Sequence, residues 1–178
     1  LDELRIDFKI QNGILDIYNE LKKQNKYKNQ DLFFYMQISR GKAPRAHSFP
    51  KGKTKVGIYA FLGVKDINIK EYNEGTTVCT VADNRWERCD IKCISLVANC
   101  LANQIAIDNN CSESLFVKND EIREGSHTNV FFVKNNEVYT YKSSNDIFVS
   151  RLSFIYSIEF FMISLLSKSS LTSFVLEV

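Results

Sequence analysis

The spacing of apolar residues along the chain alternates between a helical and a strand period. Residues 10–24 place apolar side chains three and four positions apart, which predicts an amphipathic helix. Residues 32–39 alternate, with Phe34 on one face and Tyr35 on the other, which predicts a half-buried strand. Two further strands are predicted, at 54–62 and 76–82.

A second helix and a run of short strands are predicted to follow. The helix spans 95–108, and one side of it carries Leu96, Cys100, Leu101 and Ile105. After it come three short apolar patterns, at 114–118, 129–134 and 137–142. Polar turns such as Asn119-Asp120 separate them, which predicts an antiparallel meander. We therefore expect an α/β (α+β) chain with a small first layer and a mostly antiparallel sheet over 76–142.

The last segment, 147–178, differs in composition from the rest of the chain. Ser, Phe, Ile and Leu dominate it, without clean alternation or a helical stripe. A membrane helix requires about 20 apolar residues free of charge, whereas 147–166 contains Arg151 and Glu159. We interpret 147–178 as an atypical apolar tail, and we favour this over a membrane span.

Composition narrows the classes of function. The chain has 178 residues, of which 44% are hydrophobic and 25% are charged, the balance of a soluble globular protein. A net charge of +2 gives no indication of nucleic-acid binding. The lysines cluster at 22–28 and 51–55, where a solvated surface is a simpler interpretation than an anion site.

The cysteines indicate a reducing compartment. There are five of them, an odd number, with no Cys-x-x-Cys pair and only two histidines. This pattern argues against a disulfide framework and against a metal site. The opening residues lack the pattern of a signal peptide, so we predict a cytoplasmic protein with free thiols.

Lys92 is the first candidate for chemistry. Apolar residues flank it, just before the second predicted helix. Burial among such neighbours favours a neutral amine, which is a nucleophile toward carbonyls. Many lysines with apolar neighbours instead extend the ammonium group into water, so the pattern alone leaves both interpretations open.

Arg45 and His47 form a second candidate site in the Gly- and Pro-containing loop at 41–52. They alternate, so both side chains project the same way if the loop is extended. A guanidinium beside an imidazole can bind a carboxylate, the arginine through two hydrogen bonds, and Tyr35 on the neighbouring strand can add a phenol. A solvated surface loop accounts for the same residues.

Glu124 is the third candidate, at a junction between apolar runs and directly before Gly125. A carboxylate that faces an aromatic ring nitrogen keeps that nitrogen protonated, which makes the ring an electron sink. A solvated turn residue is the alternative.

Three longer segments carry a resemblance to a known family. The segments are RGKAPRAHSFP, DNRWERCDIKCISL and EGSHTNVFFVKNNEVYTY. In order and spacing they resemble the class IV pyridoxal-phosphate enzymes, and the PRAH stretch is similar to the D-amino acid aminotransferase branch. The likeness covers about residues 2–147. It implies a two-lobed class IV aminotransferase-like fold, with lobes at 1–64 and 65–146 before the 147–178 tail.

The resemblance also implies roles for the candidate residues. Lys92 matches the lysine that binds pyridoxal 5′-phosphate (PLP) as a Schiff base and moves the substrate proton. Glu124 matches the acid paired with the pyridine nitrogen, and Gly125 lets the backbone pass close to the ring. Tyr35, Arg45 and His47 match the substrate-binding residues, with Arg45 and His47 on the α-carboxylate. The implied reaction moves an amino group between a D-amino acid, such as D-alanine, and a 2-oxo acid, in a homodimer.

The sequence departs from the family pattern at both ends. The family's phosphate-binding arginine lies in a segment that precedes the start of this sequence, and its Gly-Ile-Thr turn is replaced here by the NDIFVSRLSFIYS stretch. We expect an incomplete version of the fold in which PLP binding is weak or absent, so that the chain on its own is a poor aminotransferase or an inactive one. A branched-chain aminotransferase, an aminodeoxychorismate lyase and a non-catalytic interaction module remain as alternatives.

Overall fold

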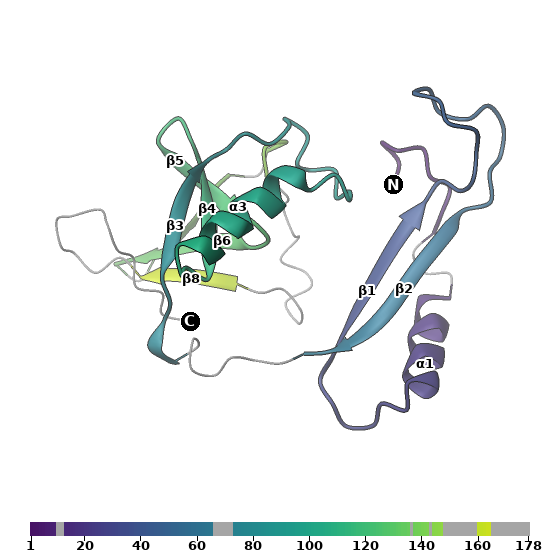
Figure 1. The fold of residues 1–178 in the computed structure, drawn as a ribbon, viewed down its shortest axis with the longest axis horizontal. Helices are drawn as coiled ribbons and strands as arrows, with labels where there is room; N and C mark the ends of the chain where they lie inside the picture. Colours follow the sequence, from purple (N-terminus) through teal and green to yellow (C-terminus); the bar gives the residue numbers. More distant parts are fainter. Residues whose placement is uncertain (10–12, 66–72, 136, 143, 148–159, 165–178) are drawn as a thin grey trace. The chain divides into compact units, whose positions relative to one another are not determined.

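The chain folds as two compact units in the computed structural model, Leu1–Ile67 and Asn68–Val178. The structure describes residues 1–9, 13–65, 73–135, 137–142, 144–147 and 160–164. Helices and strands occur in both units (Figure 1). The predicted mixed α and β composition is therefore confirmed.

Unit 1 is a helix beside a strand pair. Helix α1 (Ile14–Gln24) precedes β1 (Leu32–Ser39) and β2 (Gly57–Val64), which pair antiparallel. Gly13 has a φ of 77°, a left-handed conformation outside the helical region, so the helix begins immediately after it. The predicted residues 10–12 lie outside the described part of the chain.

The packing of α1 on the strand pair confirms the sequence pattern in β1. The Tyr18 ring of α1 meets the Phe34 ring edge-on at 6.0 Å, and Figure 1 shows α1 running beside the two strands. Phe33 and Tyr35, on the alternate face of β1, are exposed. The Tyr35 ring stacks on Phe61 of β2 at 5.1 Å between centroids.

Unit 2 begins with a parallel strand pair joined by a helix. Strand β3 (Val78–Ala82) lies parallel to β4 (Glu113–Lys118), and α3 (Val97–Asp108) belongs to the connection between them. A crossover helix is the usual way to join parallel strands. Strand β5 (Glu121–Gly125) then pairs antiparallel with β4. The turn between them holds Asn119 and Asp120, whose φ values of 54° and 61° are the left-handed pair of a tight hairpin.

The predicted three-stranded meander is wrong in one respect. Strand β6 (Asn129–Lys134) pairs with β7 (Glu137–Thr140) as predicted, but β4 and β6 belong to different sheets. The sheet orders are β3-β4-β5 and β7-β6-β8. Strand β5 was not predicted, because Glu121–Gly125 alternates only weakly between apolar and polar residues.

Helix α3 packs against β4 through a side other than the apolar side that the sequence predicted. Ala102 and Ala106 are its buried residues, and the Ser114 hydroxyl of β4 donates a 2.6 Å hydrogen bond to the Ala102 carbonyl. Small side chains permit this close approach of helix and strand. The four apolar residues on the predicted side are exposed: Leu96, Cys100, Leu101 and Ile105.

The described core of unit 2 holds the sheets together. Leu115 and Val130 are fully or almost fully buried, and the partly buried Val78, Ile122 and Phe132 pack against them. These residues come from β3, β4, β5 and β6, so strands of both sheets share one core. Burial of this kind contributes about 25 cal/mol per Å² of apolar surface.

Most of the predicted tail at 147–178 lies outside the described residues. Within it, β8 (Phe160–Ser164) pairs parallel with β6. A search of the described residues found no helix of the length and apolar character needed to cross a membrane.

Candidate functional site

Glu124 lies near the end of β5 and is buried. Its carboxylate accepts a hydrogen bond from the Arg85 Nη1 of the segment after β3, in a close ion pair. The Glu124 side chain is 7% exposed and the Arg85 side chain 4% exposed. Glu124 is therefore a buried charge with a charged partner, and the interpretation as a solvated turn residue is wrong.

Arg85 also binds a second buried carboxylate. Its Nε and Nη2 donate to the two oxygens of Asp83, each at 2.9 Å, in a bidentate pair. The guanidinium carbon lies 4.2 Å from the centre of the Phe116 ring. One guanidinium thus holds Asp83 and Glu124 together, in a geometry that fixes the direction of both carboxylates.

The electrostatics of this cluster follow from burial and pairing. Burial opposes the charge on Arg85, but the hydrogen bonds to Asp83 and Glu124 outweigh it and raise the pKa of Arg85. Burial likewise favours neutral Asp83, yet its contacts with Arg85 lower the pKa of that carboxyl. Burial raises the pKa of the nearby Cys89 thiol. Asp83 is therefore ionised at neutral pH.

The segment at 144–147 contacts the same cluster through Asp146. The Asp146 carbonyl accepts a 3.3 Å hydrogen bond from Arg85, and the Asp146 carboxylate binds Arg123 Nη1 at 2.7 Å. Arg123 is 5% exposed, and its Nε has no hydrogen-bond partner among the described residues. A second buried arginine therefore directly precedes Glu124 in the sequence, and Asp146 contacts both arginines.

The residues after Glu124 form a tight turn. The Gly125 amide donates a 2.8 Å hydrogen bond to the Thr128 carbonyl. A Cβ on Gly125 would lie 2.1 Å from the Thr128 hydroxyl and 2.7 Å from a carboxylate oxygen of Glu113. Glycine is therefore required here by packing inside the chain itself.

Lys92 lies in the segment between β3 and α3, in the same unit as Glu124. Its side chain is exposed, while its neighbours Ile91 and Cys93 are partly buried. The apolar neighbours therefore pack without burying the amine, as in lysines that extend toward water.

The three predicted substrate residues lie in unit 1. Tyr35 is on β1, where its hydroxyl accepts a 2.5 Å hydrogen bond from Gln37. Arg45 and His47 are exposed in the loop between β1 and β2. Both are accessible to a ligand in solution.

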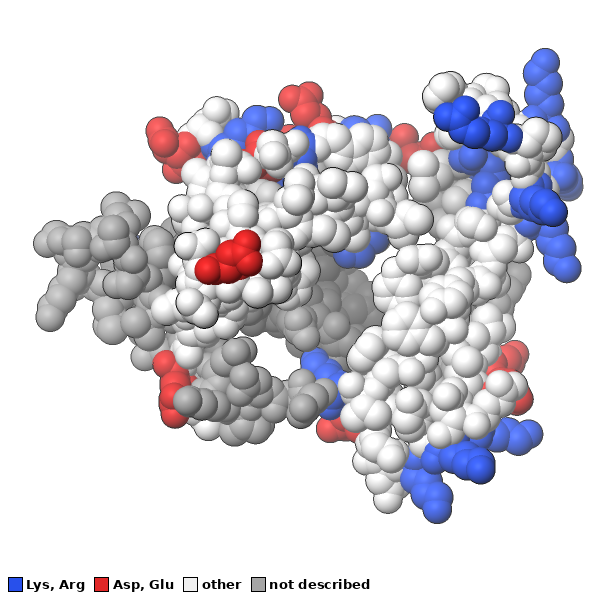
Figure 2. Space-filling view, viewed as in Figure 1, with Lys and Arg blue, Asp and Glu red and all other residues white. Residues whose placement is uncertain are grey.

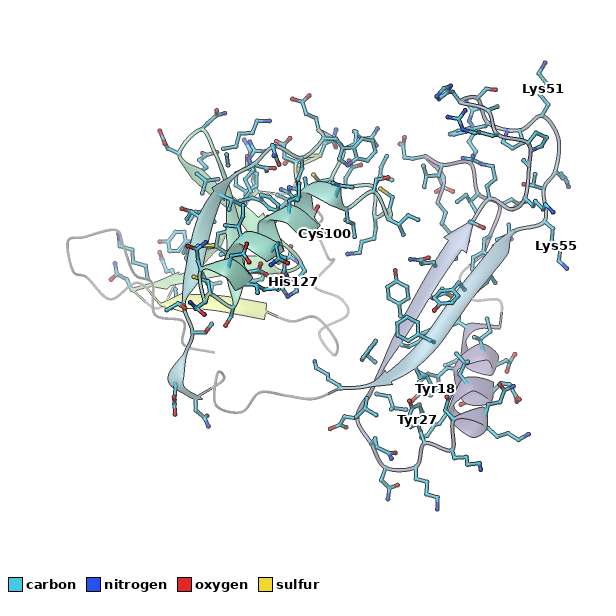
Figure 3. All side chains as sticks on the ribbon, viewed as in Figure 1. Tyr18, Tyr27, Lys51, Lys55, Cys100 and His127 are labelled. Carbon is cyan, nitrogen blue, oxygen red and sulfur yellow. The ribbon has the colours of Figure 1, made fainter. Side chains whose placement is uncertain are left out.

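A cavity in unit 1 lies beside the same loop. It has a volume of about 460 Å³, and its charged lining consists of Arg5, Asp7, Arg40, Lys51 and Lys53. Figure 2 shows Lys and Arg gathered over this end of the unit, and Figure 3 shows Lys51 and Lys55 extending outward there. Neither Arg45 nor His47 lines the cavity.

Asp83, Arg85 and Glu113 were not among the residues predicted from the sequence. Asp83 directly follows the apolar run of β3, and Arg85 comes two residues later. An Asp and Arg at the end of a predicted strand were a usable signal. Glu113 gave a weaker one, because a single acid before an apolar run is common.

Comparison with known proteins shows which family the chain resembles. Residues 3–150 match the family model described as amino-transferase class IV. The D-alanine aminotransferase of Staphylococcus haemolyticus is 37% identical over 132 residues, which cover 74% of this chain and 46% of that enzyme. The D-alanine aminotransferase of Bacillus licheniformis is 36% identical over 128 residues, covering 68% and 44%.

Solved structures share the fold at lower identity. A branched-chain amino acid aminotransferase from Thermobaculum terrenum, solved in its PLP form, matches with a TM-score of 0.65 at 18% identity, covering 89% of this chain and 55% of that one. A fold IV transaminase from Curtobacterium pusillum matches with a TM-score of 0.60 at 17% identity, covering 76% and 47%. The chain spans about half the length of the curated relatives it matches. On the family match and these identities, the chain belongs to the class IV aminotransferases.

Proposed function

We propose that the chain binds PLP and acts in the transfer of an amino group between a D-amino acid, such as D-alanine, and a 2-oxo acid. The observation that carries this proposal is the buried Asp83–Arg85–Glu124 cluster in the unit that also contains Lys92. The D-alanine aminotransferases among its relatives support the choice of substrate. The proposal includes lobes at 1–64 and 65–146, a homodimer and a cytoplasmic location.

The residues present fit the cofactor chemically. PLP carries an aldehyde and a pyridine nitrogen, and the unit contains a primary amine at Lys92, an exposed residue, and a directed carboxylate at Glu124. Isolated buried carboxylates tend to take up a proton, whereas contact with the Arg85 guanidinium favours the charged form of Glu124. A charged carboxylate is the form that stabilises a protonated ring nitrogen.

Each residue then has a separate task. When bound, PLP supplies an electron sink for the bonds at the substrate α-carbon. Lys92 would hold the cofactor and would move the proton of the substrate α-carbon, and Glu124 would keep the ring nitrogen protonated. Arg45 and His47 bind the α-carboxylate through charge-assisted hydrogen bonds, and Tyr35 adds a phenol beside them.

Borohydride reduction of the chain with PLP tests the proposed attachment. Reduction converts a lysine-bound cofactor into a stable secondary amine, so even weak binding leaves a label. Peptide mapping should place the label on Lys92. A label on the exposed lysines of the 51–55 cluster, equal to that on Lys92, would contradict the proposal.

A substrate panel separates the D-amino acid proposal from the related activities. The chain should convert bound cofactor with D-alanine and not with L-leucine or aminodeoxychorismate. Conversion with L-leucine would favour a branched-chain aminotransferase, and pyruvate release from aminodeoxychorismate would favour a lyase. Lys92→Ala is the control, because it removes the proposed base in all three cases.

A further inference from the structure

Glu113, the first residue of β4, is a fully buried carboxylate outside the Asp83–Arg85–Glu124 cluster. Burial of a charged group is unfavourable unless hydrogen bonds replace the lost water. Every donor to Glu113 in the described contacts, apart from the neighbouring Ser114 amide, comes from the turn at 126–128. The Glu113 carboxylate therefore binds one specific segment, the turn at 126–128.

Three consecutive residues of the turn bind this one carboxylate. Ser126 donates to Glu113 Oε1 twice, from its amide at 3.0 Å and from its hydroxyl at 2.5 Å. The Thr128 hydroxyl donates to Oε2 at 2.8 Å, and His127 Nδ1 lies 3.2 Å from the same oxygen. Figure 3 shows His127 close to α3, consistent with its contact with Asn103.

Gly125 connects the carboxylate to the proposed cofactor site. A Cβ at Gly125 would lie 2.7 Å from Glu113 Oε2, so the carboxylate packs directly on the backbone that follows Glu124. The Ser126 amide is held twice, by Glu113 Oε1 and by the Ser114 carbonyl at 2.9 Å. The backbone on the C-terminal side of Glu124 is therefore fixed by Glu113.

We propose that Glu113 is a positioning residue that holds the 125–128 turn so that the Glu124 carboxylate meets Arg85 and the cofactor ring. The part that concerns the cofactor rests on the proposed function. The part that concerns the Glu124–Arg85 pair stands on the chain's own contacts.

Two substitutions of Glu113 separate geometry from charge. Glu113→Gln keeps the length of the side chain: its oxygen can accept from Ser126, and its amide can donate to the Thr128 hydroxyl, which is also an acceptor. Glu113→Asp keeps the charge but shortens the side chain by one C–C bond, about 1.5 Å. A positioning role predicts that Gln resembles the wild type and that Asp does not.

The first measurement needs no cofactor. The Arg85 guanidinium resonances in ¹H–¹⁵N NMR report its pairing with Glu124. They should shift in Glu113→Asp and keep their wild-type positions in Glu113→Gln. Glu121→Asp, which shortens an exposed carboxylate on β5, the strand that carries Glu124, is the control and should leave them unchanged. A residue that only stabilises the fold would lower the melting temperature without moving Arg85 in the folded protein.

The second measurement is the Kd for PLP, read from absorbance. Glu113→Asp should weaken binding roughly tenfold, the lower end of the effect of losing a residue that orients a ligand group, and Glu113→Gln should bind like the wild type. If the wild type itself binds no PLP, the proposed function fails, but the Arg85 resonances still decide the role of Glu113.

Two results would overturn the inference. One is a Glu113→Asp protein whose Arg85 resonances match the wild type; the other is a Glu113→Gln protein that shifts them as far as Asp does. Should Glu113→Asp fail to fold, Ser126→Ala decides in its place, because it removes the 2.5 Å hydroxyl contact with Glu113, together with the 3.2 Å contact with His127 Nδ1, and keeps the contact of the Ser126 amide with Glu113. Unmoved Arg85 resonances in Ser126→Ala would then equally overturn the inference.

Discussion

Replacing Arg85 with methionine tests the buried cluster most severely. Methionine keeps much of the aliphatic volume beside Phe116 but removes the guanidinium. Asp83 and Glu124 then both lose the cation with which they form ion pairs. Their side chains are 5% and 7% exposed, so water cannot replace the lost partner without opening the fold.

The size of the effect follows from this burial. Removing one partner of a buried ion pair destabilises a protein by about 3–5 kcal/mol, because it leaves uncompensated charge in the interior. Arg85→Met should lower the free energy of unfolding by an amount in this range. Adding Asp83→Asn and Glu124→Gln to Arg85→Met should recover part of the loss, since the unpaired charges disappear.

Urea denaturation followed by tryptophan fluorescence measures the loss. The chain has one tryptophan, Trp86, which is adjacent to Arg85, so the signal follows unit 2. The control is Arg88→Met, because the Arg88–Asp90 pair has the same 2.9 Å distance with side chains 37% and 32% exposed. Exposed pairs contribute about 0–1 kcal/mol. A similar small loss for Arg85→Met would refute the structural role of the cluster.

Three further outcomes are expected. The pKa of Asp83 in the folded protein is lowered from its ordinary value of 3.8. Its ion pair therefore adds stability that is complete above pH 3.8 and is lost as the pH falls through the lower folded-state pKa. Urea denaturation at stepped pH should show that the difference in unfolding free energy between the wild type and Asp83→Asn disappears over this fall in pH. Arg45→Ala and His47→Ala should each weaken amino-acid carboxylate binding by about 1.5–3 kcal/mol in calorimetry, with PLP uptake unchanged; loss of PLP in both would contradict their assignment. Gly125→Ala should destabilise the chain by about 1–3 kcal/mol through overpacking, and a neutral effect in thermal melts would contradict the close contact with Thr128.

Local patterns predicted the elements whose faces are set by one neighbour. The alternation of β1 places Phe34 against Tyr18 of α1 and leaves Tyr35 exposed, because a single helix covers a single face of the strand pair. The left-handed Asn119-Asp120 turn was also predictable, because few residues adopt that conformation readily.

Features that depend on long-range packing were not predictable from the pattern. The apolar side of α3 suggested contact through Leu101 and Ile105, yet the close β4 strand admits only Ala102 and Ala106. The predicted meander was wrong because β5, which is nearly polar throughout, was not recognised as the strand that pairs with β4. Its buried Arg123 and Glu124 pair with other charges and so carry no apolar signal.

The residues of the candidate site likewise fall into those that could be predicted from the sequence and those that could not. Lys92 and Glu124 were found because they belong to motifs that resemble a family. Arg85 and Glu113 act through partners 39 and 13 residues away, at Glu124 and Ser126. Such pairings appear only once the strands are placed.

A PLP titration followed by absorbance tests the central claim, that Lys92 and Glu124 together form the cofactor site. The wild type should show a saturable change that Lys92→Ala abolishes. Glu124→Gln should weaken binding about tenfold or more, because a lost charge-assisted hydrogen bond is worth roughly 1.5–3 kcal/mol, while Glu121→Gln should bind like the wild type. An equal absorbance change in Lys92→Ala, or equal Kd values for Glu124→Gln and Glu121→Gln, would contradict the account.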